Sequence, residues 1–145
     1  MGAKQYSVLL ADDSDDDRLL LRRAFRAVAG LQLVGEVANG EEAIAYFQGT
    51  GKYADRTRYP LPELVLLDLK MPRVNGFEVL EWLQRHKPDP IKVVVLSGST
   101  DPCDIRKALQ LGADYYQSKP SDEKTRVELL QLLETSMRMF VPQQV

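Results

Sequence analysis

Cysteine is almost absent from this sequence, since Cys103 is the single thiol among 145 residues. One cysteine excludes an internal disulfide and a cysteine-ligated metal cluster. No apolar run approaches the length of about 20 residues that a transmembrane helix needs, and the first residues hold no apolar signal segment. The formal net charge of -2 provides no basic field for nucleic acid. We therefore expect a reducing, cytoplasmic setting, without a membrane or a nucleic acid as partner.

Short apolar runs alternate with amphipathic segments along the whole chain. Apolar runs of this length predict strands, and apolar residues at helical spacing between capping and stop signals predict helices. The expected strands are 7–12, 31–38, 64–68, 91–96 and 114–118. The expected helices lie between the cap Ser14 and the stop Gly30, at 40–48, at 76–86, at 101–111, and from 121 to about 140.

Five strand–helix repeats of this kind indicate a parallel sheet covered by helices on both faces. The first, third and fourth strands are solidly apolar, as central parallel strands are, whereas the second and fifth carry polar residues typical of edges. We therefore expect an α/β fold: a flavodoxin-like, doubly wound sheet of five parallel strands in the order 2-1-3-4-5, with five helices. The chain 1–145 reads as one domain with a core of about 6–140 and an extended loop at 49–62.

Polar residues stand where four of the predicted strands end, and a doubly wound sheet gathers those ends at one edge. They are Asp12, Asp13, Asp68, Ser97 and Lys119. Three neighbouring carboxylates repel one another unless a cation joins them, and a hard ion such as Mg²⁺ or Mn²⁺ prefers oxygen ligands. Asp68 can attack a phosphoryl group, while the metal and Lys119 balance its charge and Ser97 donates to a phosphoryl oxygen.

Each residue taken alone also has an ordinary structural explanation. Asp12 and Asp13 can be helix caps, although Ser14 already serves as one. Asp68 can equally be a turn residue before Pro72, and a lysine that precedes a proline is usually solvated. A calcium loop at 13–17 is disfavoured, because arginine stands where such a loop needs glycine.

The ordered set of strand ends resembles a response regulator receiver domain, over nearly the whole chain. The resemblance implies that Asp68 accepts phosphate from a histidine kinase. It implies that Asp12 and Asp13 hold Mg²⁺ together with Asp68 and the backbone carbonyl of Lys70. The residue matching Lys119 pairs with the phosphoryl group in that family.

The same resemblance implies a switch in the second half of the chain. Ser97 would move toward the phosphoryl group, and Tyr116 is similar to the aromatic residue that changes rotamer in the family. Lys70 and Ser99 occupy the two variable positions that tune the rate of dephosphorylation in these domains.

Two further segments suggest partners. The loop at 49–62 mixes tyrosines with cations, and is either a solvated insertion or a contact surface. It is similar to the extended loop of single-domain receivers that work with phytochrome-type histidine kinases. The last helix carries more apolar residues than one sheet face needs, so we expect a homodimer through this helix with the fourth helix and the fifth strand.

The function expected is a phosphorylation-dependent switch that signals by protein contact, without an output domain. It is not a conventional enzyme, because its chemistry is self-catalysed, Mg²⁺-dependent phosphorylation and dephosphorylation of an aspartate. One alternative is a receiver module from a longer response regulator or hybrid histidine kinase. Another is an aspartyl-nucleophile phosphatase of the haloacid dehalogenase type, disfavoured because that nucleophile follows the first strand in an Asp-x-Asp motif.

Overall fold

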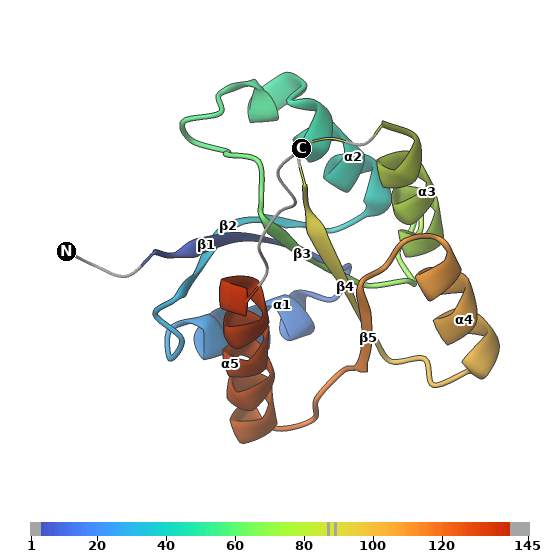
Figure 1. Ribbon diagram of the computed structural model, residues 1–145. Helices are drawn as coiled ribbons and strands as arrows, with labels where there is room; N and C mark the ends of the chain where they lie inside the picture. The colour runs from blue at the N-terminus through green and yellow to red at the C-terminus, as the bar shows by residue number, and fades with distance from the viewer. Residues whose placement is uncertain (1–3, 87, 89, 140–145) are drawn as a thin grey trace.

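The computed structural model describes residues 4–86, 88 and 90–139. Its strands are β1 (Tyr6–Ala11), β2 (Leu31–Val37), β3 (Leu64–Leu67), β4 (Lys92–Ser97) and β5 (Tyr115–Ser118). Its helices are α1 (Asp15–Phe25), α2 (Gly40–Gln48), α3 (Gly76–His86), α4 (Pro102–Gln110) and α5 (Glu123–Met139), with a short 3₁₀ helix η1 (Gly51–Ala54). The strands form one parallel sheet in the order β2-β1-β3-β4-β5, which confirms the predicted fold (Figure 1).

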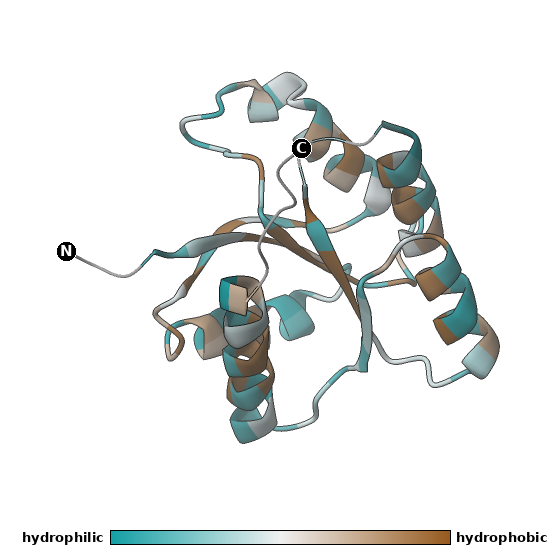
Figure 2. Cartoon of the chain, viewed as in Figure 1, coloured by the Kyte–Doolittle hydropathy of each residue, from teal (hydrophilic) through white to brown (hydrophobic). Residues whose placement is uncertain are grey.

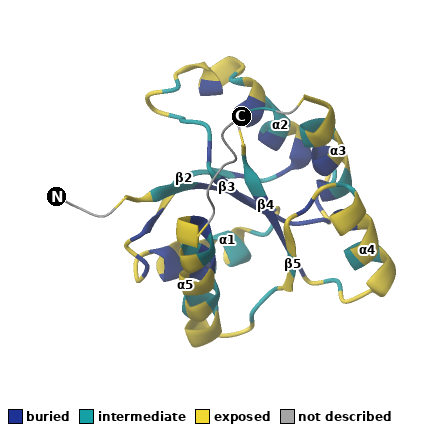
Figure 3. Cartoon of the chain, in the orientation of Figure 1, coloured by how far each residue is buried: buried dark blue, intermediate teal, exposed yellow. Residues whose placement is uncertain are grey.

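The central strands are buried on both faces because helices cover each face. Side chains alternate along a strand, so Val8 and Leu10 of β1 pack toward α1 and α5, whereas Leu9 and Ala11 pack toward α2, α3 and α4. Figure 3 shows the resulting band of buried residues through the middle of the molecule. This two-sided burial explains why the runs in β1, β3 and β4 are continuously apolar.

The first helix is shorter than its apolar spacing suggests. The sequence predicts a helix that continues toward Gly30, but α1 ends at Phe25. The amides of Arg26 and Val28 bond to carbonyls three residues earlier, at 3.2 and 3.1 Å, so the chain tightens into turns here. Val28 is still only 2% exposed, which is why the sequence pattern extends beyond the helix. The cap is confirmed, since Ser14 Oγ accepts the Asp17 amide at 3.2 Å.

Most other boundaries differ from expectation by one or two residues, and two of these differences have a clear cause. The fourth strand includes Ser97, because this residue still pairs with Ser118 of β5. The last helix begins at Glu123 rather than at Ser121, because Asp122 Oδ1 accepts the Thr125 amide at 2.7 Å and so caps the helix. Position 140, where this helix was expected to end, lies outside the described residues. In the part of the chain that is described, no helix is long and apolar enough to cross a membrane.

The extended loop is a packed part of the structure, so the interpretation as a solvated insertion is wrong. Tyr53 of η1 is 5% exposed, and its ring lies 4.9 Å from that of Tyr46 and 5.2 Å from that of Tyr59. Arg56 donates hydrogen bonds to the last carbonyls of α2, at Tyr46 (2.8 Å) and Phe47 (2.7 Å). The loop therefore closes the carboxyl end of α2, whose terminal carbonyls would otherwise need water.

Candidate functional site

Asp12 and Asp68 lie directly after β1 and β3, at the carboxyl edge of the sheet. Each amide extends the ladder by one step, with Asp12 bonding to Val37 O at 3.0 Å and Asp68 to Ala11 O at 2.9 Å. The backbone thus fixes both side chains at the same depth. Their exposed fractions are only 2% and 6%, so these two carboxylates sit in a low-dielectric environment where charge must be compensated.

Gly76, at the start of α3, supports the segment that carries Asp68. The Gly76 amide bonds to Leu69 O at 2.9 Å. A Cβ at position 76 would lie 2.4 Å from the carbonyl oxygen of Asp68 and 2.7 Å from Leu69 Cα. A side chain here would therefore displace the backbone that holds Asp68, which explains the glycine a few residues beyond the strand.

Asp13 completes a cluster of three acids with Asp12 and Asp68. One carboxylate oxygen from each lies within 4.8 Å of the others, and Asp13 is the exposed member. An all-oxygen donor set of this kind fits a hard divalent ion such as Mg²⁺ or Mn²⁺. The Lys70 amide lies 3.4 Å from Asp68 Oδ1, so this backbone borders the cluster; its carbonyl as a ligand stays a prediction.

Lys119 reaches into the same site from the end of β5. Its amide bonds to Ser97 O at 2.9 Å, which ties it to the end of β4. Its Nζ lies 2.9 Å from Asp12 Oδ2, 3.1 Å from Asp68 Oδ2 and 2.7 Å from Asp17 Oδ2. The side chain is thus a shared counter-ion for three carboxylates rather than an ordinary solvated lysine.

The charges of Lys119 and Asp12 are set by opposing effects. Burial disfavours the Lys119 ammonium, but hydrogen bonds to Asp17 and Asp12 and the charge of Asp68 outweigh it and raise the pKa of Lys119 above its ordinary value. Burial raises the pKa of Asp12, against the Ser14 amide and Lys119, which both favour its ionised form. Lys119 therefore stays charged near neutral pH and offsets the repulsion among the acids.

Ser97 and Tyr116 both hold the loop between β4 and α4. Ser97 is 1% exposed, and its hydroxyl accepts the Ser99 amide at 3.2 Å. The Tyr116 hydroxyl donates to Ser99 O at 2.6 Å. Ser99 Oγ in turn donates to Asp104 on α4 at 2.6 Å. The two predicted switch residues are therefore connected through Ser99, and their switching roles stay predictions.

Asp17 and Arg18 belong to the site although sequence reasoning did not place them there. Arg18 donates to the backbone carbonyl of Asp12, and Asp17 pairs with Lys119. A signal for Asp17 does exist in the sequence. It precedes the buried Leu21 by four residues, and residues at this spacing share one face of a helix.

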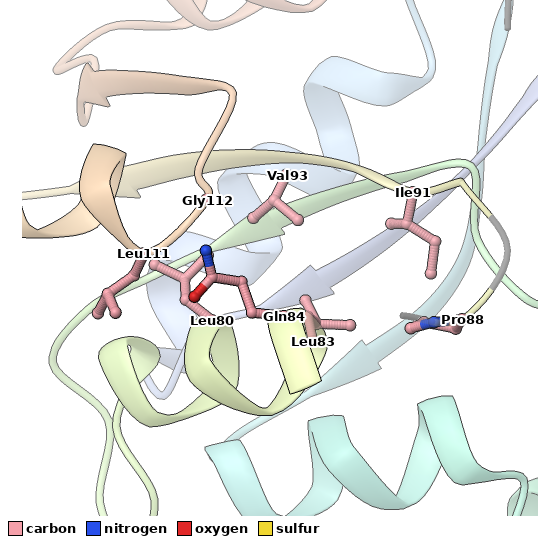
Figure 4. Close-up of a pocket in the computed structure, with 8 residues that line it drawn as sticks. All are labelled: Leu80, Leu83, Gln84, Pro88, Ile91, Val93, Leu111 and Gly112. Carbon is pink, nitrogen blue, oxygen red and sulfur yellow. The ribbon is translucent and has the colours of Figure 1, made fainter. Parts of the chain in front are cut away.

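A hollow elsewhere in the molecule is not part of this site. About 230 Å³ in volume, it lies between α3, the start of β4 and the turn after α4 (Figure 4). Its lining is mainly apolar and includes Leu83, Ile91 and Leu111. Because it borders the amino end of β4, it is remote from the carboxyl strand ends where the acids gather.

A doubly wound parallel sheet with a buried acid, a divalent-ion cluster and a lysine at its carboxyl edge defines an α/β domain suited to accept a phosphoryl group. The model of the response regulator receiver domain family matches residues 8–131, and the chain belongs to this family. Its members are the phosphorylation switches of two-component signalling, with phosphorylation on aspartate and divalent-metal binding.

Known proteins agree with this assignment. The chain is 33% identical over 136 residues to the response regulator GacA of Pseudomonas viridiflava, covering 94% of this chain and 58% of that one. It spans only 34% of a related protein-glutamate methylesterase from Myxococcus xanthus. The chain therefore matches one part of these longer relatives.

Two solved structures correspond to nearly all of the chain. The Mn²⁺-bound form of the response regulator Rcp1 has a TM-score of 0.78 and 29% identity, with 97% of this chain and 99% of that one covered. The phosphorylated cyanobacterial phytochrome response regulator RcpA has a TM-score of 0.79 and 29% identity, with coverages of 95% and 97%. The Mn²⁺-bound neighbour and the acidic cluster agree with a divalent-metal site.

Repulsion within the acidic cluster leads to a first prediction, for Asp13→Asn. Removing one of three adjacent carboxylates should stabilise the metal-free protein by about 1 kcal/mol, because like charges at this distance oppose folding. The same change should remove most of the stabilisation that Mg²⁺ provides. Urea unfolding in EDTA and in excess Mg²⁺ measures both effects. Asp16→Asn, which removes the same charge outside the cluster, is the control, and equal behaviour of the two variants would contradict the prediction.

Proposed function

We propose that this protein is a signalling switch in which Asp68 accepts a phosphoryl group from a histidine kinase. The observation that carries the proposal is the position of Asp68, buried beside Lys119 at 3.1 Å and within the divalent-ion cluster. A carboxylate in that place has its negative charge compensated and one oxygen directed at the shared cation. Asp12 shares this burial and both partners, but its other oxygen accepts the Ser14 amide at 2.9 Å. Asp68, at the end of the central strand β3, is also the aspartate that matches the phosphate acceptor of the family.

In the reaction, an Asp68 oxygen forms a bond to phosphorus while the bond from phosphorus to the donor histidine nitrogen breaks. That nitrogen keeps the electron pair. Lys119 balances charge on the phosphoryl oxygens, and a bound divalent ion supplies further charge neutralisation. The Ser97 hydroxyl, at the adjacent strand end, donates to a phosphoryl oxygen after leaving the Ser99 amide.

Movement of Ser97 would be transmitted through the β4–α4 loop. Ser99 connects the hydroxyls of Ser97 and Tyr116 with Asp104 on α4. A changed position of Ser97 therefore biases the face formed by α4, β5 and α5 between two arrangements, and the signal passes by protein contact.

The extended loop is proposed as a contact surface for a kinase of the phytochrome type. Its tyrosines are packed, while Lys52 and Arg58 are exposed over the rings of Tyr53 and Tyr59, at 5.2 and 5.7 Å from the ring centroids. The loop thus presents cations from a rigid base, which suits recognition of an acidic surface. The similarity to a phytochrome response regulator supports this choice of kinase.

A homodimer through α5 and β5 is proposed as well. Leu132 and Met139 of α5 are 68% and 78% exposed, and Tyr115 of β5 is 60% exposed. Figure 2 shows apolar residues along the visible side of α5. Between the two elements lies a largely apolar hollow of about 260 Å³, to which Leu129 contributes. A second copy placed against this surface would remove its apolar area from water.

A receiver that acts by itself is favoured over a module of a longer regulator. The support is its similarity to Rcp1 and RcpA, which it matches over nearly their whole lengths. The curated relatives favour the alternative, since the chain spans only 34% of the methylesterase and 58% of GacA. The mass of the native protein in a cell extract distinguishes the two arrangements.

The central proposal is tested with acetyl phosphate and Mg²⁺. The wild-type protein should gain one phosphoryl group by intact mass, and the adduct should disappear with EDTA because the charge neutralisation is lost. Asp68→Asn should gain none, whereas Asp55→Asn, which removes an exposed carboxylate of the loop, should react normally. An unmodified wild-type protein under all Mg²⁺ conditions, or a labelled Asp68→Asn protein, would refute the assignment.

The loop is tested by charge reversal, because Tyr53 and Arg56 make its deletion disruptive. Lys52→Glu with Arg58→Glu should slow phosphotransfer from a phytochrome-type histidine kinase about tenfold, through lost electrostatic complementarity. Labelling by acetyl phosphate should not change, since the site is untouched. Arg106→Glu on α4 provides the control charge reversal. If the kinase phosphorylates the loop variant and the wild type equally fast, the loop is not the contact surface.

The dimer is tested by light scattering across a range of concentrations, with and without a phosphate analogue. Leu132→Glu should weaken association about tenfold or more, because it places a charge in a desolvated apolar contact. The control is Gln131→Glu, which adds the same charge at the neighbouring position of α5, outside the residues that line the hollow. A wild-type protein that stays monomeric at every concentration in both states would exclude this dimer.

A further inference from the structure

Asp17 has an unusual position relative to Lys119. Of the three carboxylates around the Lys119 ammonium, Asp17 is the closest at 2.7 Å, followed by Asp12 at 2.9 Å and Asp68 at 3.1 Å. Yet the cluster suited to a divalent ion consists of Asp12, Asp13 and Asp68. Asp17 therefore binds the lysine of the site without being one of the acids that can hold the metal.

The fold holds Asp17 in this position. Its amide donates to Ser14 Oγ, which fixes the first turn of α1, and the buried Leu21 lies one turn further on the same face. The Asp17 and Lys119 side chains are 37% and 22% exposed, so the pair lies near the rim. A small hollow beside the pair is lined by Asp17, Leu21, Leu96, Lys119, Pro120 and Arg126.

A divalent ion and the Lys119 ammonium compete for the same two carboxylates. Asp12 Oδ2 and Asp68 Oδ2 both contact Nζ, and a dication that binds these carboxylates also repels a neighbouring ammonium. Lys119 must therefore withdraw from Asp12 and Asp68, at least in part, when the ion binds. Asp17 provides a carboxylate for the ammonium away from the metal ligands.

We propose that Asp17 is a positioning residue for Lys119, which holds the ammonium at the rim of the site and so leaves Asp12 and Asp68 free for the divalent ion. The inference rests on the proposed function, because it concerns the metal site that serves phosphorylation of Asp68. Its consequence is that Asp17 raises the affinity for Mg²⁺ without ligating it. In Asp17→Asn, Lys119 keeps only Asp12 and Asp68 as partners and competes more strongly with the ion.

The experiment measures Mg²⁺ affinity of the full chain by calorimetry, without a phosphodonor. Asp17→Asn should raise the Kd for Mg²⁺ about 3- to 10-fold, the size expected for a changed interaction between partly buried charges. Asp17→Glu, which keeps the carboxylate, should restore most of the affinity. Asp16→Asn removes the same charge from the same turn without the lysine contact, and should have a clearly smaller effect.

A double-mutant cycle with Lys119→Met isolates the interaction from a general loss of charge. Lys119→Met should bind Mg²⁺ more tightly than the wild type, because the competing cation is gone. In that background, Asp17→Asn should have no larger effect than Asp16→Asn. The inference is overturned if Asp17→Asn and Asp16→Asn weaken Mg²⁺ binding equally, or if the effect of Asp17→Asn persists undiminished without Lys119.

Failure of this inference and failure of the proposed function can be told apart. If the double-mutant cycle shows no coupling between Asp17 and Lys119, phosphorylation of Asp68, which is measured by mass, is unaffected as a conclusion. Conversely, a protein that binds Mg²⁺ with the predicted dependence on Asp17 but never gains a phosphoryl group would refute the proposed function and leave the role of Asp17 intact.

Discussion

The ammonium of Lys119 is the interaction on which the carboxyl edge of this sheet depends. Two carboxylates that are almost fully buried, Asp12 and Asp68, converge there with the exposed Asp13. Such a concentration of like charge opposes folding unless a cation lies among the oxygens. Lys119 supplies that cation, and because it is a single flexible point charge it can be replaced by a divalent ion. Lys119 thus compensates the charge well enough for the protein to fold, and the carboxylates can still bind a ligand.

Ladder hydrogen bonds of the sheet position these groups. Asp12 and Asp68 each extend a strand ladder, and the Lys119 amide bonds to Ser97 O at the end of β4. Parallel strands that end at one edge bring together residues from four distant parts of the chain. The order β2-β1-β3-β4-β5 is therefore as necessary to the chemistry as the side chains are.

The sequence predicts the strands and helices, because their apolar residues recur at regular spacing. It does not predict contacts that depend on how a side chain or a helix is oriented. The strand order and the gathering of Asp12, Asp68 and Lys119 follow from alternating apolar runs and the residues that end them. The packed loop could not be predicted, because Arg56 looks like a surface cation until its bonds to the α2 carbonyls are seen. In the sequence Asp17 looks like an ordinary acid of a first helical turn, where it favours the helix dipole. The rotation of α1 about its axis is what directs it to Lys119.

Successive side chains of β5 point to opposite faces of the sheet, so this strand contributes both to the surface under α4 and to the surface beside α5. Tyr116 packs with the side of the sheet covered by α4 and bonds to Ser99 O. Its neighbours Tyr115 and Gln117 face the other way and line the hollow against α5. A backbone shift of β5 would move consecutive residues together, so the movement of Tyr116 proposed above would in that case also alter the apolar face beside α5. The proposed route from the phosphoryl group to a partner is therefore short, because a single strand separates the β4–α4 loop from the surface proposed to bind a second copy.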